Sequence, residues 1–200
     1  MLSKTTHRTL ALAGAALLAA CADPGTNPVE PRDPAFAAKP GEPGAAAGRT
    51  LYQVRLEPEN GTRSRGIILI EIVGGHITVT AHAAGLAPSS HIPQHIHVNP
   101  TCNPGGGILL NLDANLTIAG EGPGVGTSYP MSNRAGVVNY YASRSLTDLL
   151  AAVNAHGGLS LTSVADLLTW LDLENRNAHM HVAVGPPFPA VNCGEVRRLN

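Results

Sequence analysis

Short apolar runs of alternating polarity, separated by glycine and proline, are the sequence feature that most restricts the fold of this chain. From His76 to His82 apolar residues alternate with polar ones, as in a strand with one buried face. Gly66–Val73 is an almost continuous apolar run, and Gly74 and Gly75 between the two runs indicate a β-hairpin. Repetition of this pattern predicts a mainly β protein, an antiparallel sandwich or barrel.

One region departs from the β pattern. Apolar residues recur at helical spacing from Leu146 to Val153, and Ser163 with Asp166 resembles a helix-capping pair. We therefore expect a short insertion of one or two helices within residues 145–173. Further strands are expected over Tyr52–Leu56, His95–His97, Ile108–Leu112, Asn115–Ile118, Gly136–Ala142 and Arg176–Val184.

Two His-x-His pairs, each followed by a cysteine, are the candidate functional motif. In a strand, residues i and i+2 point to the same face, so His95 with His97 and His179 with His181 would each present two imidazoles together. Imidazole is a preferred ligand of copper and zinc. If the two strands are neighbours, these four histidines can surround one ion, for which we expect copper, with zinc possible at the same site. Solvent-exposed histidines on a surface strand are the alternative.

The individual histidines are open to different readings. His179 is either the fourth ligand or a neighbour that supports the other three. His91 is expected in a loop, with a metal ligand contributed from that loop as the alternative, while His76 and His82 are expected on exposed strand positions. Met180 is a potential soft ligand, but strand alternation predicts that it points into the core.

The N-terminus predicts export from the cytoplasm. Basic residues precede a short apolar run that ends before Cys21, as in a signal peptide over residues 1–20. The sequence around Cys21 resembles a bacterial lipobox, which implies a lipid on this cysteine and attachment to a membrane. The chain would then lie in the cell envelope, on the periplasmic side of the outer membrane or at the cell surface. A plain signal peptide with an incidental cysteine is the alternative.

Composition and cysteine number define the remaining organisation. Residues 21–48 are rich in Pro, Ala and Gly and are expected to form a tether, followed by one domain over residues 49–200. In an oxidising compartment, Cys102 and Cys193 are expected to form a disulfide, with two buried thiols as the alternative. The formal net charge of −1 does not favour nucleic acid as a partner. No Ser-His-Asp, Walker or Rossmann pattern indicates hydrolase, nucleotide or hydride chemistry. The oligomeric state is not predicted.

The segment from Gly85 to His97 resembles the Cu,Zn superoxide dismutase segment in which Gly-Leu and a turn precede a copper-binding His-x-His. It is also similar to the corresponding segment of bacterial CHRD domains. Arg176 precedes His181 as the family's arginine precedes its last copper histidine, and Cys193-Gly194 resembles the family's C-terminal end. The resemblance implies a Greek-key β-sandwich or barrel. It also implies His95, His97 and His181 as copper ligands and a disulfide between Cys102 and Cys193.

The chain also departs from the family pattern. The histidine- and aspartate-rich zinc loop has no counterpart, so no separate zinc site is expected, and His156 is at the wrong distance to be the bridging histidine. Ala190 stands where the family has the arginine that guides superoxide. We therefore expect an envelope-anchored copper-binding domain. A copper-only superoxide dismutase and a non-enzymatic CHRD-like interaction module are the alternatives.

Overall fold

The computed structural model of this chain describes residues 48–102, 107–121, 129–181 and 190–200. The predicted signal peptide, Cys21 and most of the tether lie outside these residues, as does the end of the strand predicted over Arg176–Val184. In the described part, no helix has the length and hydropathy needed to cross a membrane.

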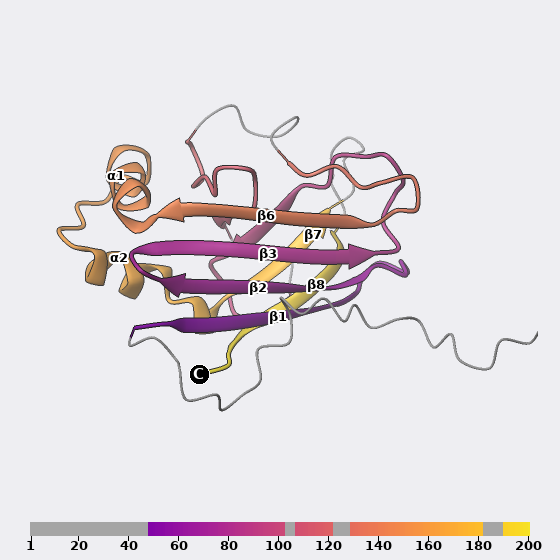
Figure 1. Cartoon of the computed structure of the whole chain (residues 1–200), viewed down its shortest axis with the longest axis horizontal. Helices are drawn as coiled ribbons and strands as arrows, with labels where there is room; N and C mark the ends of the chain where they lie inside the picture. Colours follow the sequence, from indigo (N-terminus) through magenta and orange to yellow (C-terminus); the bar gives the residue numbers. More distant parts are fainter. Residues whose placement is uncertain (1–47, 103–106, 122–128, 182–189) are drawn as a thin grey trace, which may run out of the picture. The chain divides into compact units, whose positions relative to one another are not determined.

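In the described part of the chain, eight strands, all paired antiparallel, form the fold (Figure 1). Their order across the sheet is β5-β4-β7-β8-β1-β2-β3-β6. Because β3 pairs with β6 while β4 and β5 lie at the other end of the sheet, the chain crosses over as in a Greek-key arrangement. The prediction of a mainly antiparallel β fold is confirmed. The strands are β1 (Thr50–Pro58), β2 (Arg65–Val73), β3 (His76–Ala84), β4 (Gln94–His97), β5 (Ile108–Asn111), β6 (Val138–Ser145), β7 (Asn177–His181) and β8 (Ala190–Arg198).

Strand β8 joins the two halves of the sheet, because it pairs with β1 on one edge and with β7 on the other. In Figure 1, the antiparallel strands β1, β2, β3 and β6 lie side by side, and β7 and β8 run at an angle to them. Gly194 lies where β8 meets β1, and a Cβ at this position would lie 2.1 Å from the carbonyl oxygen of Arg55. Only glycine permits this close approach of the two backbones.

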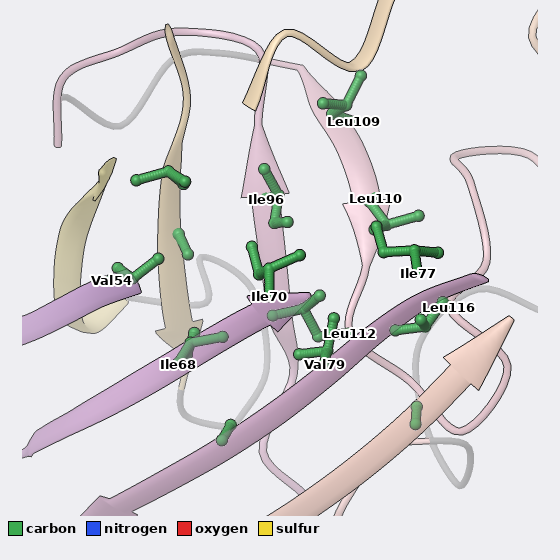
Figure 2. Packing of buried hydrophobic residues seen from close by; sticks show 14 of the residues in the cluster. Val54, Ile68, Ile70, Ile77, Val79, Ile96, Leu109, Leu110, Leu112 and Leu116 are labelled. Atoms are coloured by element: carbon green, nitrogen blue, oxygen red, sulfur yellow. The ribbon is translucent and has the colours of Figure 1, made fainter. Parts of the chain in front are cut away.

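The core lies between the two halves. Side chains of β2 and β3, including Ile70 and Val79, face Ile96 of β4 and Leu110 of β5 (Figure 2). These positions follow from strand alternation, because the intervening residues of β3 are more exposed. The β4 side chain between the two histidines of its pair, Ile96, is therefore part of the core.

Two short helices follow β6, as predicted: α1 (Leu146–His156) and α2 (Val164–Leu171), with a 3₁₀ turn over Leu173–Asn175. Ser145 caps α1 and Ser163 caps α2, each accepting a hydrogen bond from the backbone N–H three residues ahead. The helical insertion is therefore confirmed.

Two features differ from the sequence analysis. The strand predicted over Asn115–Ile118 is wrong: the Asp113 carboxylate accepts hydrogen bonds from the N–H groups of Asn115 and Thr117 and bends this segment into a loop. Strand β8 was not predicted, because Ala190–Gly194 is buried throughout and shows no alternation of polarity.

Candidate metal centre

The two His-x-His pairs lie on neighbouring strands, β4 and β7, and point to the same face. His95 lies directly opposite His179 in the antiparallel register. Ile96 and Met180 point to the other face and are fully buried in the core. Both strands show a register shift at the second histidine, between Ile96 and His97 and between Met180 and His181. Such irregularities redirect side chains at the rim of a sheet.

Three of the four histidines form a compact group. One ring nitrogen each of His95, His97 and His181 lies within 4.8 Å of the others. The ring centroid of His95 lies 5.8 Å from that of His97 and 5.2 Å from that of His181. The arrangement brings three imidazole nitrogens close enough to converge on one ion after small side-chain adjustments.

Tyr129 fixes the tautomer of His95. The Tyr129 hydroxyl donates its hydrogen to Oδ1 of Asn111 at 2.9 Å, while Nδ2 of Asn111 donates to Oγ1 of Thr117 at 3.1 Å. The Tyr129 oxygen, 2.8 Å from Nε2 of His95, must therefore accept a hydrogen bond from an Nε2–H group. Nδ1 of His95 then carries the lone pair. This atom is buried and has no hydrogen-bond partner among the described residues.

Burial keeps the imidazole of His95 uncharged at neutral pH. Desolvation, followed by repulsion from His181, His97 and His179, lowers the pKa of His95 to about 3. Desolvation also raises the pKa of Tyr129 to about 12, so its hydroxyl stays protonated. A neutral imidazole with one lone pair is the form that binds a metal.

His179 has different contacts from the other three histidines. Its Nε2 lies 3.2 Å from Sγ of Cys193, and its Nδ1 lies 3.7 Å from Oε2 of Glu59. Burial lowers the pKa of His179 to about 4, with further contributions from His97 and His181. The ring still borders the group, with its centroid 4.8 Å from that of His97. Of the two roles left open for His179, its contacts favour that of a neighbour.

The disulfide predicted between Cys102 and Cys193 is present, and it ties the segment after β4 to β8, at the position where β8 pairs with His179 of β7. The fully buried Asn177 donates from Nδ2 to the carbonyl oxygens of Asn99 and Thr101 in that segment. Arg176, which the family resemblance aligned with the family's arginine, donates to the Val98 carbonyl at 2.7 Å. The segment after β4 is thereby fastened beside the histidine group.

Of the histidines that the structure describes, the other four lie outside the group. Nδ1 of His91 lies 3.0 Å from the backbone oxygen of Tyr129, and His156 is exposed at the end of α1. His76 lies exposed on β3, and His82 on the same strand contacts Asn139.

Sequence reasoning missed three residues at the site: Tyr129, Asn111 and Glu59. Glu59 lies in the turn after β1, which is fastened to β8 by a backbone hydrogen bond from Glu59 N–H to Val191 O. Tyr129 and Asn111 lie in no motif, and only the folded chain brings them to His95.

In comparisons with known proteins, this chain matches solved structures only. No family model and no curated protein matches this chain. Among solved structures, 96 chains match. One of them is the Cu(II) form of superoxide dismutase 5 from Candida albicans, with 12% sequence identity and a TM-score of 0.46 over 76% of this chain and 93% of that chain. The assignment of the site therefore rests on its own geometry.

Proposed function

We propose that this protein binds one copper ion through His95, His97 and His181. The observation that carries the proposal is the convergence of three imidazoles. Tyr129 accepts a hydrogen bond from Nε2–H of His95, which leaves the lone pair on Nδ1 of His95 for a metal. A buried nitrogen without a hydrogen-bond partner in the described part of the chain is costly unless it has another role. Metal coordination supplies such a role.

The donor set favours a borderline transition metal. An all-imidazole group suits copper or zinc, whereas magnesium and calcium prefer oxygen ligands. Among divalent first-row ions, copper binds such nitrogen ligands most tightly. Zinc would occupy the same three histidines as a competitor.

The proposal includes attachment to the cell envelope. The apolar run before Cys21 and its lipobox-like surroundings support a lipid anchor on Cys21. An anchored copper-binding domain would buffer, store or deliver copper at the membrane. Labelling with a radioactive fatty acid in the native host tests the anchor, and Cys21→Ala is expected to abolish the label.

Metal stoichiometry of the full chain tests the copper site. After loading with copper or zinc and mild chelation, we expect about one retained copper per chain. His181→Gln should release it, while His76→Gln, on the exposed surface of β3, should not. Equal retention by both variants would remove His181 from the site. No retained metal in the unmodified chain would favour a non-enzymatic interaction module of the CHRD kind.

A copper-only superoxide dismutase is the second candidate. It is supported by the count of converging imidazoles: three ligands leave a coordination position for substrate, whereas four can saturate the ion. Copper would supply one-electron redox chemistry, and the chain's residues would hold the ion and its neutral imidazoles in place. Disproportionation of superoxide by the loaded protein, well above a chelated control, is expected in this case. Activity equal to the control would exclude it.

A further inference from the structure

A second group of potential ligands lies beside the three histidines. Glu59, His179 and Cys193 each offer one ligand atom, and these atoms lie within 4.8 Å of one another. Glu59 comes from the turn after β1, His179 from β7 and Cys193 from β8. In the oxidised protein this group cannot complete a metal site, because Sγ of Cys193 is bonded to Cys102 and is not a thiolate.

The two sulfurs of the disulfide differ in access. Cys193 is 2% exposed, whereas Cys102 is half-buried. Both cysteines line a groove of about 640 Å³ that runs along β1 and β8 and is bordered by Arg55 and Arg197 as well as by Glu57 and Glu195. An incoming thiolate therefore reaches Cys102 more easily than Cys193, through a groove that both basic and acidic side chains line.

We propose that reduction of the Cys102–Cys193 disulfide opens a second metal site, in which the Cys193 thiolate, His179 and Glu59 bind Zn²⁺. The reductant is a protein dithiol. One of its thiolates attacks Sγ of Cys102, the S–S bond breaks, and Cys193 leaves as a thiolate. The second thiolate of the dithiol then releases Cys102. Two electrons pass from the dithiol, which becomes a disulfide, to the cysteine pair.

The chemistry of the three ligands favours zinc. Thiolate sulfur, imidazole nitrogen and carboxylate oxygen are the three ligand types that zinc uses in proteins. Cys193 and His179 are directly opposite each other in the register of β7 and β8, and Sγ already lies 3.2 Å from Nε2. The site therefore needs a change in covalent state and no rearrangement of the sheet. The sequence pattern predicts no separate zinc site, and this one exists only in the reduced chain.

Two matched variants of the full chain isolate the role of the Cys193 thiolate. Cys102→Ser leaves Cys193 as a free thiol, and Cys102→Ser/Cys193→Ser removes the thiol as well, while both lack the disulfide. Co²⁺ serves as a spectroscopic substitute for Zn²⁺, because thiolate ligation gives a sulfur-to-cobalt charge-transfer band. We expect the band in the single variant, its absence in the double variant, and its displacement by Zn²⁺.

Further variants in the Cys102→Ser background distinguish this site from the three-histidine site. His179→Gln or Glu59→Gln should weaken or abolish the band, whereas His91→Gln should leave it. The band should persist when His181→Gln dismantles the proposed copper site, so failure of the copper site does not remove this result.

A folded Cys102→Ser protein without the charge-transfer band would overturn the proposal. If circular dichroism shows this variant to be unfolded, the unmodified chain decides instead. It would be reduced at low temperature with a phosphine and titrated with Co²⁺. The band on reduction supports the site, and its absence from the reduced, folded chain rejects it.

Discussion

At the scale of single residues, Tyr129 has the most specific role, because its one hydroxyl determines which nitrogen of His95 carries a lone pair. Partners that orient a metal-binding histidine commonly change metal affinity 10- to 100-fold when removed. Tyr129→Phe is therefore expected to weaken copper binding by about 10- to 100-fold. Competition titration against a chelator of known affinity measures this change.

The control for this prediction is Tyr141→Phe, which removes a hydroxyl from a side chain that is 69% exposed on β6. The control should keep full affinity. A purely structural role of Tyr129 would lower stability without changing the Cu²⁺ electron paramagnetic resonance spectrum. We expect the spectrum to change, and unchanged affinity and spectrum would contradict the role of Tyr129.

At the scale of elements, the position of β8 depends on Gly194. An alanine Cβ would approach the Arg55 carbonyl oxygen to 2.1 Å, so β1 and β8 must separate. Gly194→Ala is expected to reduce the free energy of unfolding by about 1–3 kcal/mol, as for other overpacked sites. Because β8 pairs with β7, which carries the proposed copper ligand His181, copper affinity should fall with it. Urea denaturation and metal titration measure the two effects.

Gly107→Ala is the matched control, because a Cβ there meets nothing closer than a methyl group of Val98 at 4.0 Å. Its free energy of unfolding should match that of the unmodified chain. If Gly194→Ala is as stable as this control, the close approach of β1 and β8 does not limit the fold.

The elements also show how far the sequence determines this fold. Alternation over β3 and the glycine pair before it predict the hairpin, because one face of the strand is buried and the other is solvated. Helical spacing from Leu146 to Val153 and the capping pair Ser163 and Asp166 predict one or two helices, and the structure has two, with Ser145 and Ser163 as their caps. Strand β8 could not be found by alternation, because it is shared by both halves of the sheet and its first half is buried on both sides.

The candidate site also has a part that the sequence predicts and a part that it does not. His-x-His spacing places two imidazoles on one face of a strand, so the histidine set is readable from the sequence. The contacts of His179 with Glu59 and Cys193 depend on where the turn after β1 lies against β8. Tyr129 reaches His95 from a distant part of the chain. Local pattern contains no information about such contacts.

At the scale of the whole molecule, the disulfide closes a long loop, because its cysteines are 91 residues apart. Constraint of the unfolded chain predicts that Cys102→Ser/Cys193→Ser lowers the free energy of unfolding by about 2–5 kcal/mol. Thermal denaturation of the metal-free variant beside the oxidised chain measures the loss. Reduction of the unmodified chain should lower the midpoint similarly, and an unchanged midpoint in both cases would contradict the prediction.

The buried histidines make the stability of the whole metal-free molecule depend on pH. The pKa is lowered from 6.5 to about 3 for His95 and to about 4 for His179, mainly by desolvation. Below pH 6.5 the unfolded chain therefore binds more protons than the folded chain, and the free energy of unfolding falls as pH falls. The loss approaches about 1.4 kcal/mol per pH unit for each histidine. It continues down to the folded-state pKa values and is absent above pH 7.

Urea denaturation of the metal-free chain between pH 7.5 and 4.5 measures this slope. The double variant His95→Gln/His179→Gln should show a shallower slope, because glutamine does not titrate. His76→Gln should keep the full slope, since His76 is exposed on β3 and lies apart from the histidine group. Bound copper makes the free energy of unfolding depend more strongly on pH, because protons compete with the ion for the ring nitrogens. The loaded protein should therefore lose its copper and its added stability together as the pH falls. Equal slopes in the double variant and the unmodified chain would show that other groups determine the acid sensitivity of this fold.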